Sequence, residues 1–128
     1  MVKVAIIAFG GAIGAVLRYV ISGFIHQHWK AVFPIGTLIV NLSGAFLIGF
    51  LWGIFEYSTV SHGMRTFIFV GILGAYTTFS TFCLENFSLF RDGEFNQAFL
   101  NILLSNILGI ILVFAGFFVS KFITEIIK

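Results

Sequence analysis

Four apolar stretches, each long enough to cross a lipid bilayer as a helix, make up most of this chain and leave little room for any other fold. They cover residues 2–25, 35–55, 64–90 and 95–123. A helix needs about 20 mostly apolar residues to span the hydrocarbon core, and it keeps its backbone hydrogen bonds within the segment. We therefore expect an all-α membrane protein with four transmembrane helices in a single domain, residues 1–128.

The composition agrees with a surface that faces lipid. Charged residues make up 9% of the chain, whereas ordinary soluble domains have roughly 25%. The segments between the apolar stretches are short, and no nucleophile–base pair or metal-binding constellation can be assembled from them, so we do not expect an enzyme. The net charge of +2, without a basic cluster, gives no reason to expect a nucleic-acid partner.

Positive charges are almost evenly divided between the two sides of the membrane. Four spans place both termini on one side, and an excess of Lys and Arg normally marks the cytoplasmic side. The side of the termini holds Lys3, Arg65, Lys121 and Lys128, and the opposite side holds Arg18, Lys30 and Arg91. With so small a bias, copies can insert both ways round and pair, so we predict an antiparallel homodimer. The alternative is a single orientation set by another cue.

Small and polar residues recur on one face of three of the spans. Residues three or four apart share a helix face. The faces contain Gly10, Gly14 and Arg18 in the first span, Thr37, Asn41 and Gly44 in the second, and Asn101, Ser105 and Gly109 in the fourth. Lone polar groups are costly in hydrocarbon. These faces therefore indicate either hydrogen bonds between helices or a hydrated pathway, and the spacing alone leaves both open.

The third span contains a run of residues that form helices poorly. Gly71 and Gly74 are followed by the pairs Thr77-Thr78 and Ser80-Thr81. Glycine and β-branched residues weaken a helix, and hydroxyl side chains bond to nearby backbone groups. We predict that this helix is broken near the middle of the membrane. Carbonyls freed by a break are good sodium ligands, although a kink that only shapes packing is the alternative.

Phe79 and Phe82 follow directly within this run. They are three residues apart and share a face if the helix has resumed by then. The edge of a phenyl ring is electropositive, so ring edges that point into a narrow passage can contact a small anion. The same spacing also serves ordinary core packing. Beside the hydroxyl run and the amide-bearing faces, the pair is a candidate for an anion pathway.

The run from Thr77 to Phe82, preceded by Gly71 and Gly74, resembles the signature of the Fluc (CrcB) family of small fluoride channels. Two further motifs also match, and with the length and the four-span layout they extend the resemblance over essentially the whole chain. The motifs are Gly10-Gly11-Ala12-Ile13-Gly14-Ala15 with Arg18-Tyr19, and Gly36-Thr37-Leu38 followed by Asn41, Gly44 and Phe46.

The resemblance implies a function and an assembly. It implies a passive, fluoride-selective channel that exports fluoride from the cytoplasm across a bacterial inner membrane. It also implies an antiparallel dimer with two pores and a central structural sodium ion. On the matching positions, the fluoride pathway would contain Phe79 and Phe82 through their ring edges, Asn41 through an amide hydrogen, Ser105 along the same track, and Thr78 and Thr81 as supporting hydroxyls.

Further positions follow from the same resemblance. Gly74 and Thr77 would offer backbone carbonyls to the sodium ion. Arg18 would raise the anion concentration at a vestibule, with snorkelling or ion pairing as the alternative. Asn101 stands where some relatives carry an aromatic hydroxyl, and the resemblance gives no role to Asn101 or to Glu85.

Rival membrane functions remain to be weighed. A small multidrug exporter would need a carboxylate in the first span, which has none. A proton-coupled fluoride antiporter would need a titratable group in the middle of the membrane. A non-transporting scaffold would explain the glycines and the phenylalanines but would leave the polar faces without a purpose. The antiporter and the scaffold stay as alternatives.

Overall fold

The computed structural model describes residues 1–56 and 58–127, and the described part of the chain contains helices and no strand. The third span is built from several consecutive helical segments, and the fourth contains a π-helical stretch, η2, between two α-helices. The elements are α1 (Val2–His28), α2 (Ile35–Glu56), α3 (His62–Arg65), η1 (Thr66–Leu73), α4 (Gly74–Tyr76), α5 (Phe79–Arg91), α6 (Phe95–Leu103), η2 (Leu104–Leu108) and α7 (Gly109–Ile127).

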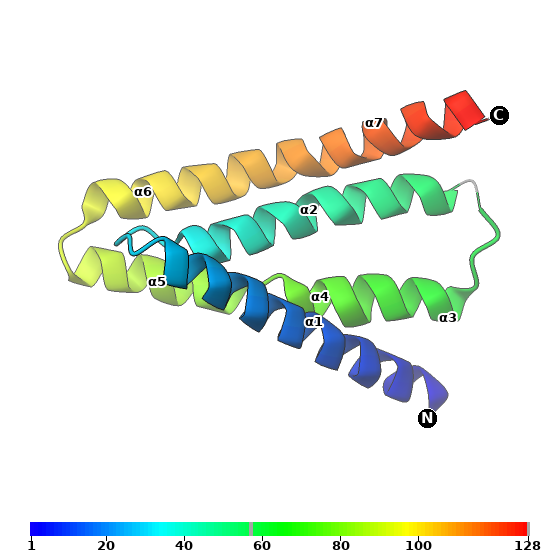
Figure 1. The fold of residues 1–128 in the computed structure, drawn as a ribbon, viewed down its shortest axis with the longest axis horizontal. Coiled ribbons are helices and arrows are strands. Elements are labelled where there is room, and N and C mark those ends of the chain that lie inside the picture. The colour runs from blue at the N-terminus through cyan, green and yellow to red at the C-terminus, as the bar shows by residue number, and fades with distance from the viewer. Residues whose placement is uncertain (57, 128) are drawn as a thin grey trace.

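Four helical stretches are long and apolar enough to cross a membrane, which confirms the predicted layout. They run over Val2–His28, Ile35–Glu56, His62–Arg91 and Phe95–Ile126, so each predicted bound differs from the observed one by three residues or fewer. Successive spans run in opposite directions, and both termini lie at the same end of the bundle (Figure 1). The protein is a multi-pass integral membrane protein.

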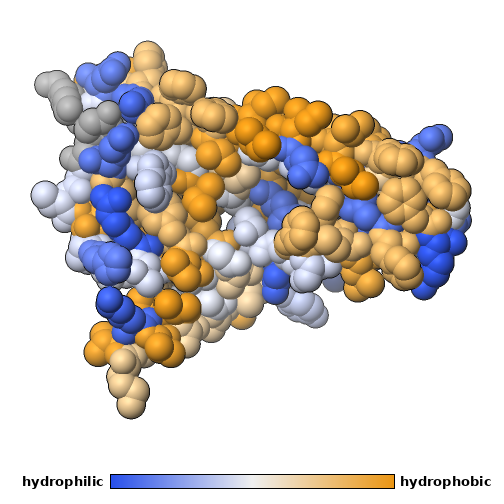
Figure 2. Space-filling view, turned by 180° about the vertical axis from the view of Figure 1, so that it is seen from behind, coloured by the Kyte–Doolittle hydropathy of each residue, from blue (hydrophilic) through white to orange (hydrophobic). Residues whose placement is uncertain are grey.

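The bundle is apolar outside and partly polar inside. Hydrophilic residues gather mainly at the two ends of the molecule, and hydrophobic residues dominate the band between them (Figure 2). The buried residues include an unusual share of polar ones. These are Thr37, Thr78, Asn86, Asn101 and Ser120, beside the apolar Val40, Leu73, Tyr76, Leu89 and Ala98. This arrangement suits a lipid-facing exterior, because in lipid polar groups are best satisfied inside the bundle.

Glycines bring the backbones of neighbouring spans into direct contact. A Cβ atom added to Gly14 of α1 would lie 2.1 Å from the carbonyl oxygen of Ile72 in η1. One added to Gly49 of α2 would lie 2.0 Å from the carbonyl oxygen of Val113 in α7. Both distances are shorter than any real contact, so only glycine fits at these crossings. Gly14 and Gly49 therefore serve close packing within one copy of the chain.

Candidate functional site

The third span is interrupted where the sequence predicted it. Helix α4 ends at Tyr76 and α5 begins at Phe79. Between them, Thr77 and Thr78 have extended backbones, with ψ 157° at Thr77 and φ −147°, ψ 122° at Thr78. Thr78 then starts α5 by accepting a hydrogen bond from the backbone N–H of Thr81 on its side-chain oxygen, at 3.3 Å. The break is a complete change of backbone conformation rather than a kink.

Asn41 of α2 satisfies the backbone at the break. Its Nδ2 donates to the carbonyl oxygen of Thr78 at 3.0 Å, and its Oδ1 accepts from the backbone N–H of Thr78 at 2.8 Å. The side-chain amide thus takes the place of a neighbouring peptide group. The spacing of polar residues in the sequence left hydrogen bonds between helices open for the helix face that contains Asn41, and the resemblance gave Asn41 itself the role of a donor to an ion. Because an amide nitrogen carries two hydrogens, the bond to Thr78 leaves one for another acceptor.

A groove of about 220 Å³ runs beside the break. It brings together α2, the extended segment, α5 and η2. The residues that line it are Asn41, Thr77, Thr78, Phe79, Phe82, Ser105 and Asn106. Five of the six residues predicted for the fluoride pathway thus share one groove, and the hydroxyl of the sixth, Thr81, accepts a hydrogen bond from the hydroxyl of Thr78 at 3.0 Å. Asn106 was not among the predicted pathway residues, although its position beside Ser105 in the sequence is consistent with its place in the groove.

The two phenylalanines share a helix face, as their spacing predicted. The ring centroids of Phe79 and Phe82 are 5.8 Å apart, with 35° between the ring planes. Phe79 is 75% exposed, so the groove is open on the side of this ring. Across the groove, the hydroxyl of Ser105 donates to Oδ1 of Asn101 at 3.2 Å. The groove is therefore lined by phenyl rings, hydroxyls and amides.

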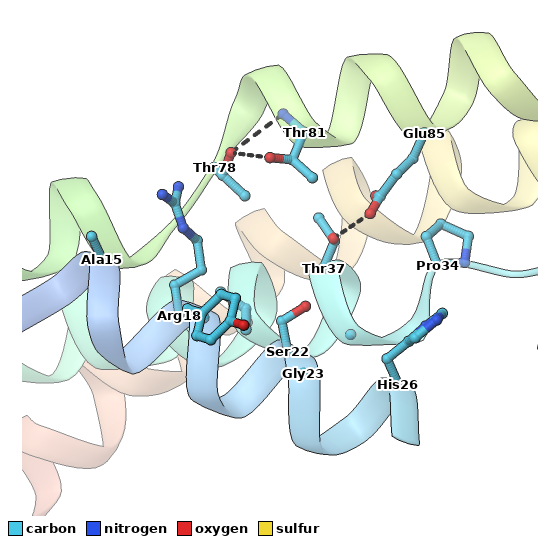
Figure 3. Close-up of a pocket in the computed structure, with 13 residues that line it drawn as sticks. Ala15, Arg18, Ser22, Gly23, His26, Pro34, Thr37, Thr78, Thr81 and Glu85 are labelled. Atoms are coloured by element: carbon cyan, nitrogen blue, oxygen red, sulfur yellow. Dashed lines mark hydrogen bonds between the residues drawn. The ribbon is translucent and has the colours of Figure 1, made fainter. Parts of the chain in front are cut away.

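A second cavity, of about 390 Å³, lies on another side of the break (Figure 3). Arg18 and Ser22 line it from α1, Thr37 from α2, and Thr81 and Glu85 from α5. This is the place predicted for a vestibule, and Arg18 lines it. Thr81 faces this cavity instead of the groove. Thr78 lines both, so the two spaces meet at the break.

Glu85 is held by a contact that sequence reasoning missed. The hydroxyl of Thr37 donates to Oε1 of Glu85 at 2.5 Å, which links α2 to α5 at the edge of the cavity (Figure 3). Both residues were noted in the sequence, Thr37 on a polar helix face and Glu85 as an acid near a span end. Their separation of 48 residues gave no sign that they would pair.

The break also presents the backbone carbonyls expected for a cation. In an unbroken helix the carbonyls of Gly74 and Thr77 would accept from the N–H groups of Thr78 and Thr81, respectively. Those N–H groups donate instead to side-chain oxygens, at Asn41 and at Thr78. Carbonyl oxygens without their helical partners are hard ligands suited to sodium. Among the described residues, no group of three or more His, Cys, Asp or Glu side chains could hold a metal ion.

Comparison with known proteins identifies the family. The sequence model described as "CrcB-like protein, Camphor Resistance (CrcB)" matches residues 5–117. A protein of Parabacteroides distasonis is 46% identical over 128 residues, which is 100% of both chains. One of Desulforapulum autotrophicum is 44% identical over 122 residues, 94% of this chain and 98% of its own. Both relatives bear the name "Fluoride-specific ion channel FluC". With the family model spanning most of its length, this chain belongs to the CrcB family.

Proposed function

We propose that this protein is a passive, fluoride-selective ion channel of a bacterial membrane that exports fluoride from the cytoplasm. The observation that carries the proposal is the groove beside the break. It gathers amide and hydroxyl groups and two phenyl rings at the break of a bundle whose exterior faces lipid. The names of the relatives, fluoride-specific ion channels, support the same function.

The chemistry of the groove suits fluoride better than larger halides. Fluoride is small and strongly hydrated, so a pathway must replace its water with closely spaced donors. Asn41 has an amide hydrogen left after its bond to Thr78. The hydroxyls of Ser105 and Thr78 line the groove but already donate to Asn101 and Thr81, so each must rotate away from that bond to donate to the anion. Phe79 and Phe82 add the electropositive edges of their rings. A larger anion would fit such a passage poorly and would leave some donors unsatisfied.

The ends of the broken helix supply fixed partial charges on both sides of the break. Helix α5 begins at Phe79, so its N-terminus, with a partial positive charge and free N–H groups, lies beside the groove. The end of α4 carries the opposite partial charge. One interrupted span therefore offers a favourable environment to an anion at one helix end and to a cation at the other.

A sodium ion is part of the proposal. The backbone carbonyls of Gly74 and Thr77 would hold it, since the break diverts their helical N–H partners to side chains. When bound, the ion supplies a fixed positive charge that favours an anion in a region of low dielectric. Arg18, in the second cavity, raises the local concentration of anions before they reach the break.

The working unit that we propose is an antiparallel homodimer with two pores. Two observations support it. Phe79 is 75% exposed although it lines the groove, so a second surface is needed to enclose the pathway. The second is the small difference in Lys and Arg between the two ends, which allows both orientations to be inserted. One end holds Lys3, Arg65, Lys121 and Lys128, and the other holds Lys30 and Arg91, with Arg18 farther inside α1. Two copies in opposite orientation would give two equivalent grooves.

The test is ion efflux from liposomes that contain the purified protein. The liposomes are loaded with fluoride or chloride, a potassium ionophore clamps the voltage, and ion-selective electrodes follow the release. We expect rapid fluoride release, no chloride release and no need for a proton gradient. Release that requires a proton gradient would replace the channel by an antiporter. If a well-folded protein releases neither fluoride nor chloride, the result would favour a non-transporting scaffold.

A further inference from the structure

Two asparagines, Asn86 on α5 and Asn101 on α6, are buried on two helices that pack against each other. Asn86 is 6% exposed and Asn101 is 1% exposed. The helices are joined by a tight connection, in which the N–H of Glu94 donates to the carbonyl of Leu89 at 2.8 Å. Asn86 lies five residues before the end of α5, and Asn101 lies six residues after the start of α6. The antiparallel hairpin therefore brings them to nearly the same level of the bundle.

Each of the two amides has one atom that lacks a partner. Among the residues that the structure describes, the buried Oδ1 of Asn86 and the buried Nδ2 of Asn101 make no hydrogen bond. The first atom is an acceptor and the second a donor, so their needs are complementary. Both side chains are buried within one copy of the chain, and a second copy cannot reach them. The missing partners must come from inside the bundle.

The other ends of the two amides hold the walls of the groove. Nδ2 of Asn86 donates to the carbonyl oxygen of Phe82 at 2.7 Å. Oδ1 of Asn101 accepts from the hydroxyl of Ser105 at 3.2 Å. Phe82 and Ser105 line the groove from α5 and η2. Asn86 and Asn101 do not line it, so they contact the groove only through these two residues.

We propose that Asn86 and Asn101 form one polar link between α5 and α6, closed by a single buried water molecule. The water accepts from Nδ2 of Asn101 and donates to Oδ1 of Asn86. Buried waters typically occupy such places, where they satisfy polar groups that have no other partner. The link fixes the spacing between Phe82 and Ser105 across the groove. Asn86 and Asn101 are thus positioning residues for the anion pathway, an inference that rests on the proposed channel function.

A pair of variants matched in shape tests the link. Threonine and valine differ by one hydroxyl. In Asn86→Thr the hydroxyl can donate to the carbonyl of Phe82, four residues earlier, while its oxygen accepts from the water. Asn86→Val can do neither. We expect Asn86→Thr to release fluoride from liposomes at nearly the wild-type rate. We expect Asn86→Val to be slower by about tenfold, the factor for the loss of one buried hydrogen bond.

A double-variant comparison separates positioning from a general effect on stability. If Asn86 acts through Asn101, the difference between Asn86→Thr and Asn86→Val should disappear when each is combined with Asn101→Leu. A loss of packing alone would persist in both backgrounds. Rates are compared per folded protein, measured by size-exclusion chromatography. The surface variant Asn96→Leu, on α6, is the control and should conduct normally, because Asn96 is exposed.

The outcomes distinguish this inference from the proposed function. Equal fluoride release by folded Asn86→Thr and Asn86→Val would overturn the link, as would a difference that survives in the Asn101→Leu background. A wild-type protein that releases no fluoride would instead count against the channel. Should Asn86→Val fail to fold, a crystal structure of the wild-type protein at a resolution that shows waters decides. Density between the two amides supports the link, and its absence overturns it.

Discussion

At the scale of single residues, the groove depends on side chains that hold the backbone as much as on those that face an ion. Asn41 does both, because its amide bonds to the peptide groups of Thr78 and still carries a free hydrogen. Phe82 has no polar atom in its side chain and contributes to the groove only through its ring. Variants of Phe82 should therefore affect fluoride release alone, whereas variants of Asn41 should affect both fluoride release and the stability of the fold.

Replacement of the Phe82 ring should remove conduction and keep the fold. Phe82→Ile retains an apolar side chain but loses the electropositive ring edge. We expect fluoride release from liposomes to fall by about tenfold or more. The matched control is Phe87→Ile on the same helix, which should conduct normally because Phe87 is 61% exposed and does not line the groove. Unimpaired release by Phe82→Ile would remove the ring-edge account.

Asn41→Asp should block the pathway and also weaken the break. Aspartate keeps the acceptor for the N–H of Thr78 but loses the donor to its carbonyl, and it places a negative charge in the path of an anion. The lost buried bond should cost about 1–3 kcal/mol of stability. Thermal unfolding and fluoride release are the two measurements. Normal conduction would mean that Asn41 does not line the pathway.

At the scale of helices, the packing of α2 against α7 sets the positions of the groove walls. Gly49 of α2 lies against the backbone of Val113, whereas Gly109, the first residue of α7, has no atom within 4 Å of the position its Cβ would take. The two glycines thus allow the same substitution at a crowded site and at an open one.

Gly49→Ala should destabilise the bundle, and Gly109→Ala should not. The methyl group at position 49 would overlap the carbonyl of Val113 and force the helices apart, at a cost of about 1–3 kcal/mol. At position 109 the methyl meets open space, and alanine favours a helix more than glycine does. Thermal unfolding in detergent compares the two. Equal stability would show that α2 and α7 are less close than described.

Local patterns in the sequence predicted the helices well. They did not predict which residues far apart in the chain would be hydrogen-bonded to each other. The thickness of the bilayer fixes how long an apolar stretch must be, so the four spans were found with small errors at their ends. The break was predictable because Thr77 and Thr78 are poor helix formers in succession. The side chain that bonds to the broken segment was not predictable, because Asn41 and Thr78 are 37 residues apart in the chain. Thr81 was grouped with the fluoride pathway but lines the second cavity.

At the scale of the whole molecule, we expect the small difference in positive charge between the two ends to let copies enter the membrane in both orientations. Both termini lie at the same end (Figure 1). A tag at the N-terminus should therefore be detected on both sides of the membrane in similar amounts. Added positive charge at one end should change the fraction of copies in each orientation. Arginines introduced at Thr59 and Ser61 should place the termini mainly on the cytoplasmic side.

The orientation experiment has a matched counterpart. Arginine at Gln27, near the opposite end, should bias insertion the other way. Each biased variant alone should release little fluoride, and the two expressed together should restore release, because only together do they supply both orientations. A tag found on one side alone in the wild-type protein would contradict the antiparallel dimer.

The two hydrogen bonds between Asn41 and Thr78 have a mechanical consequence. They join α2 to the interrupted span at one level, and no bulk water is present in the hydrocarbon core to replace them. The two spans cannot slide past each other there without losing both bonds. The reach of a single side chain therefore fixes the separation of these walls. If this groove is the ion pathway, we expect it to keep a constant width and to select ions by fit, without a moving part.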